Sequence, residues 1–294
     1  MAIKKAQELT AGGDRVLLLA YNQLIGERLK ESVREYAGVT ASTYHDFCLG
    51  VLEKTGRVPE GTRDDEYYTR LVPQAFLEVV SLGTGQYDSL IVDEGQDFRS
   101  DYWNSLTYLL RDGGRYYIFY DPDQNVFGTD MDFPIKEEPF VLSRNCRNTK
   151  SICEFVGSYT RSDIRPMPGI PVGMQVQEHV NPSPVGRRRH LNRILEWLVS
   201  EQDIAPERVV VLGGHSIDKT SIPSGGQLGE FRVVQSEETG PDIIHYYTYM
   251  KFKGCEADAV ILLDVDPSDG RWSDRAIYTT ASRAKFLLFV LRTA

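Results

Sequence analysis

The sequence lacks the features that mark a disulfide-bonded, membrane-bound or strongly basic protein. Only 4 of its 294 residues are cysteines, and because they are scattered without a CxxC pair, neither a zinc site nor a disulfide framework is indicated. No apolar run reaches the roughly eighteen residues of a membrane span, and the N-terminal MAIKKAQEL has no apolar stretch behind its lysines, unlike a signal peptide. These absences favour a reducing cytoplasm and predict no membrane partner.

An excess of basic charge is also missing. The 33 lysines and arginines are outnumbered by 42 aspartates and glutamates, which leaves a net charge of −9. This balance argues against a protein held on nucleic acid by bulk positive charge, although it allows a local basic groove. The one short basic run, GRRRH (186–190), is interpreted as a solvated surface. With 41% hydrophobic and 26% charged residues, the chain has the composition of an ordinary globular protein.

Short apolar segments alternate with amphipathic ones almost throughout the chain. The candidate strands are RVLLLAY (15–21), YDSLIVD (87–93), RYYIFY (115–120), FVLS (140–143), RVVVLG (208–213), FRVVQ (231–235), IIHYYTY (243–249), ADAVILLD (257–264) and FLLFVLR (286–292). Helical faces between them carry Tyr68, Leu71, Val72, Ala75, Phe76 and Val79, and later Leu191, Ile194, Leu195, Leu198 and Val199. Near-continuous apolar strands are typical of parallel sheets covered on both faces, so the sequence predicts a doubly wound α/β fold. The charged, proline-containing segment GTDMDFPIKEEP (128–139) predicts a boundary, giving domains 1–138 and 139–294.

The strongest local signal is LIVDEGQDF (90–98). An apolar strand ends here in two adjacent acids, which places Asp93 and Glu94 at the carboxyl edge of a parallel sheet, where open α/β folds bind ligands. One carboxylate can hold Mg²⁺ on nucleotide phosphates while its neighbour polarises the attacking water. Taken alone, two solvated acids at a strand end would be the better interpretation.

Four further segments follow in order. DPDQNVF (121–127) places Gln124 after a strand, and LSRNCRNTKSI (142–152) surrounds Arg147 with small polar residues. TYMKFKGCEADAVIL (248–262) sets a Lys-Gly turn and Glu256 just before a buried strand, and IYTTASRAKFLLFVL (277–291) places Arg283 at a helix start. Each segment is weak evidence by itself, since an arginine near a helix is usually a surface ion pair.

Taken together, these segments resemble the motifs of the UvrD/Rep-type superfamily I DNA helicases. DEGQDF resembles their Walker B motif, usually DEAQD, and DPDQ resembles their GDPDQ sensor motif. NCRN, KGCEADAV and TTASRAK are similar to NYRS, KGLEFDVV and VALTRAK, while VLLLAYNQLIGERL (16–29) and STYHDFC (42–48) match two early single-strand-contact motifs. The resemblance implies two RecA-like domains with ATP and Mg²⁺ between them and single-stranded DNA as partner, RNA not being excluded.

The resemblance also implies a role for each matching residue. Asp93 would coordinate Mg²⁺, Glu94 would be the catalytic carboxylate, and Gln96 and Gln124 would link the γ-phosphate to the DNA site. The remaining roles are arginine fingers at Arg147 and Arg283, nucleotide contacts at Gly254 and Glu256, and a strand path lined by Asn22, Thr43, His45, Phe127 and Thr248. Without its motif, His45 would be interpreted as a capping or core histidine. Two positions depart from the family, since Cys146 replaces an adenine-stacking aromatic and Met250 replaces a histidine.

The largest departure is the missing phosphate loop. No GxxxxGK[ST] motif occurs, although its backbone N–H groups and lysine bind the phosphates in this family. The nearest string, GGHSIDKT (213–220), carries Asp218 at an essential glycine position. IKKAQELTAGG (3–13) is similar to the helix behind the phosphate loop, so we expect the chain to begin just after that loop. Loss of the central strand before it would leave unpaired backbone groups on flanking strands and lower stability, unless an upstream domain or a partner chain supplies the strand.

Three hypotheses of function follow from the sequence. The first is the core of an ATP-dependent DNA helicase or translocase that is inactive as it stands because the phosphate loop is absent. The second is a non-catalytic nucleic-acid-binding or scaffold module that keeps the helicase shape. The third, an unrelated α/β nucleotide enzyme, leaves Arg147, Arg283 and the order of the motifs unexplained.

Overall fold

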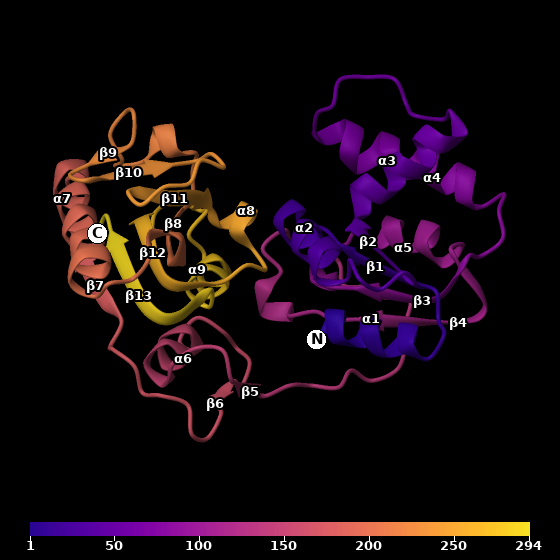
Figure 1. The fold of residues 1–294 in the computed structure, drawn as a ribbon, viewed down its shortest axis with the longest axis horizontal. Helices are drawn as coiled ribbons and strands as arrows, with labels where there is room; N and C mark the ends of the chain where they lie inside the picture. Colours follow the sequence, from indigo (N-terminus) through magenta and orange to yellow (C-terminus); the bar gives the residue numbers. More distant parts are fainter. The chain divides into compact units, whose positions relative to one another are not determined.

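Two parallel sheets, one in each half of the chain, organise the computed structural model, which describes residues 1–294. The chain divides into the units Met1–Pro139 and Phe140–Ala294, and each is described separately (Figure 1). None of the helices combines the length and the apolar character that crossing a membrane requires. All four cysteines are free thiols.

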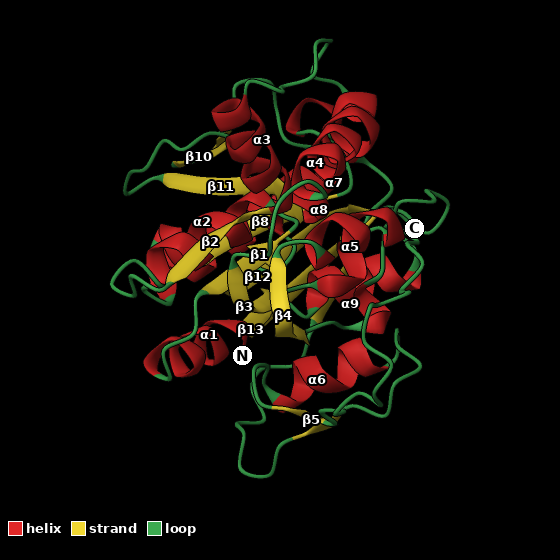
Figure 2. Cartoon of the chain, turned by 90° about the vertical axis from the view of Figure 1, so that its right-hand side faces the viewer, coloured by secondary structure: helices red, strands yellow, loops and turns green.

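The first unit contains a sheet of four parallel strands in the order β2 (Val39–Thr43), β1 (Val16–Ala20), β3 (Tyr87–Val92) and β4 (Leu110–Ile118). The helices α1 (Ala2–Ala11) and α2 (Gln23–Ser32) cover one face, where Val16, Leu18 and Ala20 of β1 point. The opposite face of β1, with Leu17 and Leu19, is covered by α3 (Tyr44–Thr55), the π-helical turn η1 (Tyr67–Leu71), α4 (Val72–Val80) and α5 (Ser100–Thr107). Helices therefore lie on both faces of the strands (Figure 2).

The second unit contains seven strands in the order β7 (Gln177–Val180), β13 (Ala284–Arg292), β12 (Ala257–Val265), β8 (Val209–Gly213), β11 (Ile243–Thr248), β10 (Phe231–Val234) and β9 (Gln227–Leu228). All adjacent pairs are parallel except β10 with β9. One face packs against α6 (Lys150–Gly157), α8 (Tyr249–Phe252) and α9 (Asp274–Ala281), and the other against α7 (Pro184–Glu196) and η4 (Trp197–Glu201). A two-residue ladder joins β5 (Arg144–Asn145) to β6 (Arg165–Pro166). The predicted α/β class with doubly covered parallel sheets is thus confirmed.

One predicted strand is wrong. The segment 140–143 forms no strand, and its apolar side chains are exposed, with Phe140 reaching 89%. The apolar run resembles a strand, but it has no neighbouring strand to pair with, and the ladder of this region begins only at Arg144. Five observed strands lie outside the predicted ranges because they are short or polar: β2, β5, β6, β7 and β9.

The four strands of the first sheet are continuous. The strands β1 and β3 each pair with two neighbours, so the open edges are β2 and β4. The Phe119 N–H donates to the Val92 carbonyl of β3. In a parallel pair, the backbone groups of alternate residues point toward the partner strand, so those of Tyr116 and Ile118 point away from β3. Backbone groups without a strand partner therefore lie along the outer edge of β4, as they do along that of β2.

A charged network closes the amino-terminal end of this sheet. The Asp14 carboxylate accepts hydrogen bonds from the Ser89 hydroxyl at 2.6 Å and from Arg115 Nη2 at 2.6 Å. Asp88 accepts the backbone N–H of Arg15 at 2.7 Å and forms an ion pair with Arg111. The Ser89 hydrogen bond, and after it the Arg115 charge, lower the pKa of Asp14 from its ordinary value of 3.8.

Acid should therefore weaken the first unit through Asp14. A carboxyl whose pKa is lower in the folded state stabilises the fold above its unfolded pKa, and this contribution is lost as pH falls through the folded pKa. We expect Asp14→Asn to destabilise Met1–Pro139 at neutral pH and to differ progressively less from the wild type below pH 3.8. Urea unfolding of both proteins from pH 6 to pH 2 measures this difference, and a difference that stays constant across the range would contradict the assignment.

Candidate functional site

The turn after β3 presents the two acids that the sequence singles out. Asp93 N–H bonds the Leu19 carbonyl of β1 at 2.9 Å, and Gly95 N–H bonds the Phe119 carbonyl at 2.8 Å. Glu94 between them has a φ of 54°, a left-handed conformation that costs a non-glycine residue roughly 1–3 kcal/mol. Asp93 and Glu94 therefore lie at the carboxyl edge of the sheet, as predicted, on a turn that neighbouring strands hold in place.

A hydrogen-bonded chain connects Glu94 to the segment after β4. The Gln96 amide Nε2 donates to Glu94 Oε2 at 2.6 Å, and Gln96 Oε1 accepts the backbone N–H of Asp121 at 3.0 Å. Gln124 Nε2 then donates to Asp121 Oδ2 at 2.6 Å. Gln96 is fully buried and Gln124 nearly so, which makes an unpaired amide at either position costly. Glu94, Gln96 and Gln124, three of the predicted site residues, thus share one network through Asp121.

Phe127 lies close to this network on an exposed loop. Its ring is 44% exposed and meets the Tyr21 ring edge to face, with centroids 5.6 Å apart. Tyr21 also contacts the rings of His45 and Phe98 at 5.4 and 6.3 Å. An exposed ring backed by a packed aromatic cluster is suited to stacking on a nucleic-acid base.

Three of the predicted strand-contact residues act as helix caps. Asn22 Oδ1 accepts the Leu24 N–H at 2.9 Å, Thr43 Oγ1 accepts the Asp46 N–H at 3.1 Å, and Thr248 Oγ1 accepts the Lys251 N–H at 3.4 Å. They stand at the N-termini of α2, α3 and α8, where β1, β2 and β11 end. Each side chain satisfies a helix donor, and Thr43 is buried.

His45 is held inside the same aromatic cluster. Its Nε2 lies 3.0 Å from the Tyr68 carbonyl, and its ring packs edge to face against Tyr21, Tyr44 and Tyr68. Burial lowers the pKa of His45 below its ordinary 6.5, so the ring is neutral at pH 7 and its Nε2–H donates to the carbonyl. This geometry is that of a core histidine, the interpretation that the residue favours without its motif.

In the second unit the structure pairs two predicted residues with each other. Arg147 Nε lies 3.2 Å from Glu256 Oε2, and both side chains are partly exposed. Gly254, two residues before Glu256, has a φ of 80°, which explains the glycine in the Lys-Gly turn because larger residues avoid this region. Arg147, expected as an arginine finger, is thus bonded to the acid that was expected to approach the nucleotide sugar.

Arg283 does not stand where the sequence places it. We expected a helix start, but α9 ends at Ala281 and Arg283 follows it, just before β13. Its side chain is 2% exposed, with Nε donating to the Thr279 carbonyl at 2.9 Å and Nη2 to the Ser282 hydroxyl at 3.1 Å. The guanidinium therefore also satisfies groups at the C-terminal end of α9, where a positive charge is favourable.

The residues present fit only part of an ATP and Mg²⁺ site. The carboxylates of Asp93 and Glu94 are oxygen ligands of the kind that Mg²⁺ prefers, but no group of three or more His, Cys, Asp or Glu side chains could hold a metal by itself. Asp93 would therefore hold Mg²⁺ only together with nucleotide phosphates. The sequence encodes no GxxxxGK[ST] cradle of backbone N–H groups for those phosphates.

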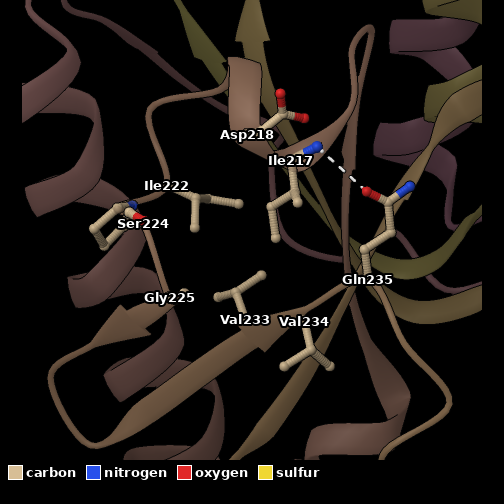
Figure 3. Close-up of a pocket in the computed structure, with 10 residues that line it drawn as sticks. Ile217, Asp218, Ile222, Ser224, Gly225, Val233, Val234 and Gln235 are labelled. Carbon is tan, nitrogen blue, oxygen red and sulfur yellow. Dashed lines mark hydrogen bonds between the residues drawn. The ribbon is translucent and has the colours of Figure 1, made fainter.

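The glycine-rich string 213–220 does not supply that cradle. It leads from β8 into the single 3₁₀ turn η6 (Ile217–Lys219), which has no α-helix behind it. Beside this turn lies a pocket of about 380 Å³, where Ile217, Ile222 and Val233 face one another and Ile217 N–H bonds Gln235 Oε1 (Figure 3). Because apolar side chains face one another across it and no lysine or arginine lines it, the pocket is unsuited to phosphate.

Comparisons with known proteins yield only low similarities. No family model matches the chain, and no curated protein matches it. The solved C-terminal domain of a possible DNA helicase from Lactobacillus plantarum WCFS1 is similar over 50% of this chain and 86% of that chain, with 18% identity and a TM-score of 0.38. Arterivirus nonstructural protein 10, a helicase solved in complex with DNA, is similar over 99% of this chain and 57% of that chain, with 16% identity and a TM-score of 0.41. Similarities of this size assign neither a family nor a function to the chain.

Sequence reasoning missed several residues that complete the site of the first unit. Asp121 joins Gln96 to Gln124, Tyr21 supports Phe127, and Asn125 and Thr129 shape the loop that carries Phe127. Asp121 could have been recognised, because it stands inside the quoted DPDQ motif directly after a predicted strand. Tyr21 depends on a contact with a segment far along the chain, whereas the hydrogen bonds between Asn125 and Thr129 are local and match no motif.

Proposed function

We propose that the chain forms the core of an ATP-dependent helicase or translocase that moves on single-stranded DNA and that hydrolyses no ATP as it stands. The observation that supports this most is the partly buried chain of hydrogen bonds from Glu94 through Gln96 and Asp121 to Gln124. A carboxylate that orients water and an amide that senses a phosphate must lie close together, and the closeness of the Glu94 carboxylate to the Gln96 and Gln124 amides supports such a role for them. The order of the sequence motifs, which resembles that of superfamily I helicases, supports the same function.

In this proposal each unit contributes different groups. Asp93 would hold Mg²⁺ together with nucleotide phosphates, Glu94 would orient the attacking water, and Phe127 with Tyr21 would offer a stacking surface to the strand. Arg147, Arg283, Gly254 and Glu256 belong to the second unit and would keep the nucleotide-contact roles that the motif resemblance implies. Because Arg147 is paired with Glu256, it would have to exchange this carboxylate for a phosphate oxygen, which is a comparable charge-assisted partner.

Mg-ATP hydrolysis with and without single-stranded DNA tests the proposal. The chain and its Glu94→Gln variant should both bind a single-stranded oligonucleotide and show no turnover. A version carrying an added strand and GxxxxGK[ST] loop before Met1 should hydrolyse ATP when DNA is present, and Glu94→Gln should reduce that rate by about 100-fold or more. DNA-stimulated turnover by the chain without the loop would contradict the predicted inactivity, and absence of oligonucleotide binding would contradict the proposal.

A non-catalytic nucleic-acid-binding or scaffold module is the second candidate. The Arg147–Glu256 ion pair favours it, because it occupies a group that catalysis would need. This candidate predicts unchanged oligonucleotide binding in the Glu94→Gln variant and continued absence of turnover after the loop is added. The helicase proposal predicts the opposite result for turnover, so one set of assays separates the two.

A further inference from the structure

The loop from Asn125 to Thr129 is closed by one side-chain amide. Asn125 Oδ1 accepts the Thr129 N–H at 3.0 Å, and Asn125 Nδ2 donates to the Thr129 carbonyl at 2.8 Å. Between them Gly128 adopts a φ of 65°, which lets the chain reverse within a few residues. Phe127 is therefore presented at the tip of a small closed loop, and it cannot move far without moving Thr129.

Thr129 connects this loop to the turn that carries Glu94. Its hydroxyl donates to the backbone carbonyl of Gln96 and also lies 3.3 Å from Asn125 Oδ1. A hydroxyl has a single hydrogen to donate, so it can serve one of these acceptors fully and not both. The geometry thus offers two discrete states, one with the loop fastened to Gln96 and one with the hydroxyl turned back to Asn125.

A change in the Thr129 hydrogen bond would reach Glu94 and Asp121 through Gln96. The same residue donates its side-chain amide to Glu94 at 2.6 Å and accepts Asp121 N–H at 3.0 Å. Because Gln96 is fully buried, water cannot replace a hydrogen-bond partner that its backbone carbonyl loses. A shift of this carbonyl therefore also displaces the groups that hydrogen-bond to the Gln96 side chain.

We infer that Thr129 is a positioning residue that couples a base stacked on Phe127 to the Glu94 turn. The inference rests on the proposed function, because it assumes that Phe127 contacts a nucleic-acid strand. A base held on Phe127 fixes the closed loop and so favours donation by Thr129 to Gln96, which orders the turn from Glu94 to Asp97. Nothing in the sequence motifs indicates this role for position 129.

Hydrogen exchange followed by mass spectrometry tests the coupling on the chain as it is. A saturating oligothymidylate should slow exchange of the Gly95 and Asp97 amides by about fivefold or more. In Thr129→Val, which keeps the shape and loses the hydroxyl, the oligonucleotide should bind within about threefold of the wild-type affinity, and the exchange of these amides should no longer respond to it. Thr129→Ser restores a hydroxyl and should restore the response.

The outcomes separate this inference from the proposed function. If Thr129→Val binds the oligonucleotide as the wild type does, and the exchange of its Gly95 and Asp97 amides still slows as in the wild type, the role of Thr129 is overturned. The proposed function would then still stand. A Thr129→Ser variant that binds without responding would do the same, since a hydroxyl alone would then not suffice. Failure of the wild-type chain to bind the oligonucleotide would overturn the proposed function, and this inference with it.

Discussion

Replacing Arg187 with methionine should lower the free energy of unfolding of the Phe140–Ala294 unit by about 3 kcal/mol. The Arg187 side chain is 7% exposed, and its Nε donates to Asp264 Oδ1 at 2.5 Å. Its Nη1 also donates to the carbonyls of Asn181 and Pro182 at 2.7 and 3.0 Å. Without the guanidinium, the half-buried Asp264 carboxylate loses its counter-charge and two carbonyls lose their donors, and the removal of one partner from such a pair is strongly destabilising.

Arg189→Met is the matched control, because Arg189 lies two residues away on α7 and is exposed. Its substitution should change stability by no more than about 0.5 kcal/mol. Hydrogen exchange in increasing urea, followed in peptides from β8 and β12, reports on this unit separately from the other. Equal losses for the two substitutions would show that the Arg187–Asp264 pair contributes nothing specific.

The Arg187–Asp264 pair illustrates a limit of sequence reasoning. The run GRRRH was interpreted as solvated, and that holds for Arg189 but not for Arg187. Helical periodicity can place neighbouring arginines on different faces of a helix. It does not reveal that one of them forms an ion pair with an aspartate 77 positions later. Asp264 also adopts a φ of 57°, a local backbone feature that a predicted strand over 257–264 does not anticipate.

The elements that were predicted correctly share a physical cause. In β1 and β8, successive side chains alternate between two separate apolar clusters, so both faces are buried and the strand reads as a continuous apolar run. The position of Asp93 and Glu94 follows from the same pattern, because a polar residue directly after such a strand must lie at the carboxyl edge. Parallel strands thus disclose both the fold class and the location of the candidate site.

The features that the sequence does not reveal are those for which local and long-range interaction partners compete. β7 carries the polar sequence QEHV at a sheet edge and has no apolar period to recognise. Thr43 and Thr248 match strand-contact motifs, yet in the structure their hydroxyls cap helices. A motif gives the residue type that a site needs, but the backbone around it decides which partner that residue takes.

Replacing Gly95 with alanine should destabilise the Met1–Pro139 unit by about 1–3 kcal/mol, although alanine is the usual residue of the helicase motif that this turn resembles. A Cβ on Gly95 would lie 2.5 Å from Ile118 Cγ2 and 3.5 Å from the Phe119 carbonyl oxygen. Ile118 belongs to β4 and pairs with Val92, and its branched side chain is stiff, so the methyl group cannot turn aside at low cost. The turn or the strand must shift instead.

Gly50→Ala is the control within the same unit, because a Cβ at this position of α3 meets no atom within 4 Å. Alanine there should stabilise the unit by about 0.5–1 kcal/mol, so the two substitutions should act with opposite signs. Introducing Gly95→Ala into an Ile118→Ala background should reduce its cost by about 1 kcal/mol or more, since the colliding methyl group is gone. An equal cost in both backgrounds would exclude this contact as the cause.

Because Gly95 N–H bonds the Phe119 carbonyl at 2.8 Å, any shift of Ile118 also moves the support of Glu94. The substitution that makes this turn more similar to the helicase motif should therefore disturb, in this chain, the carboxylate that the motif exists to place.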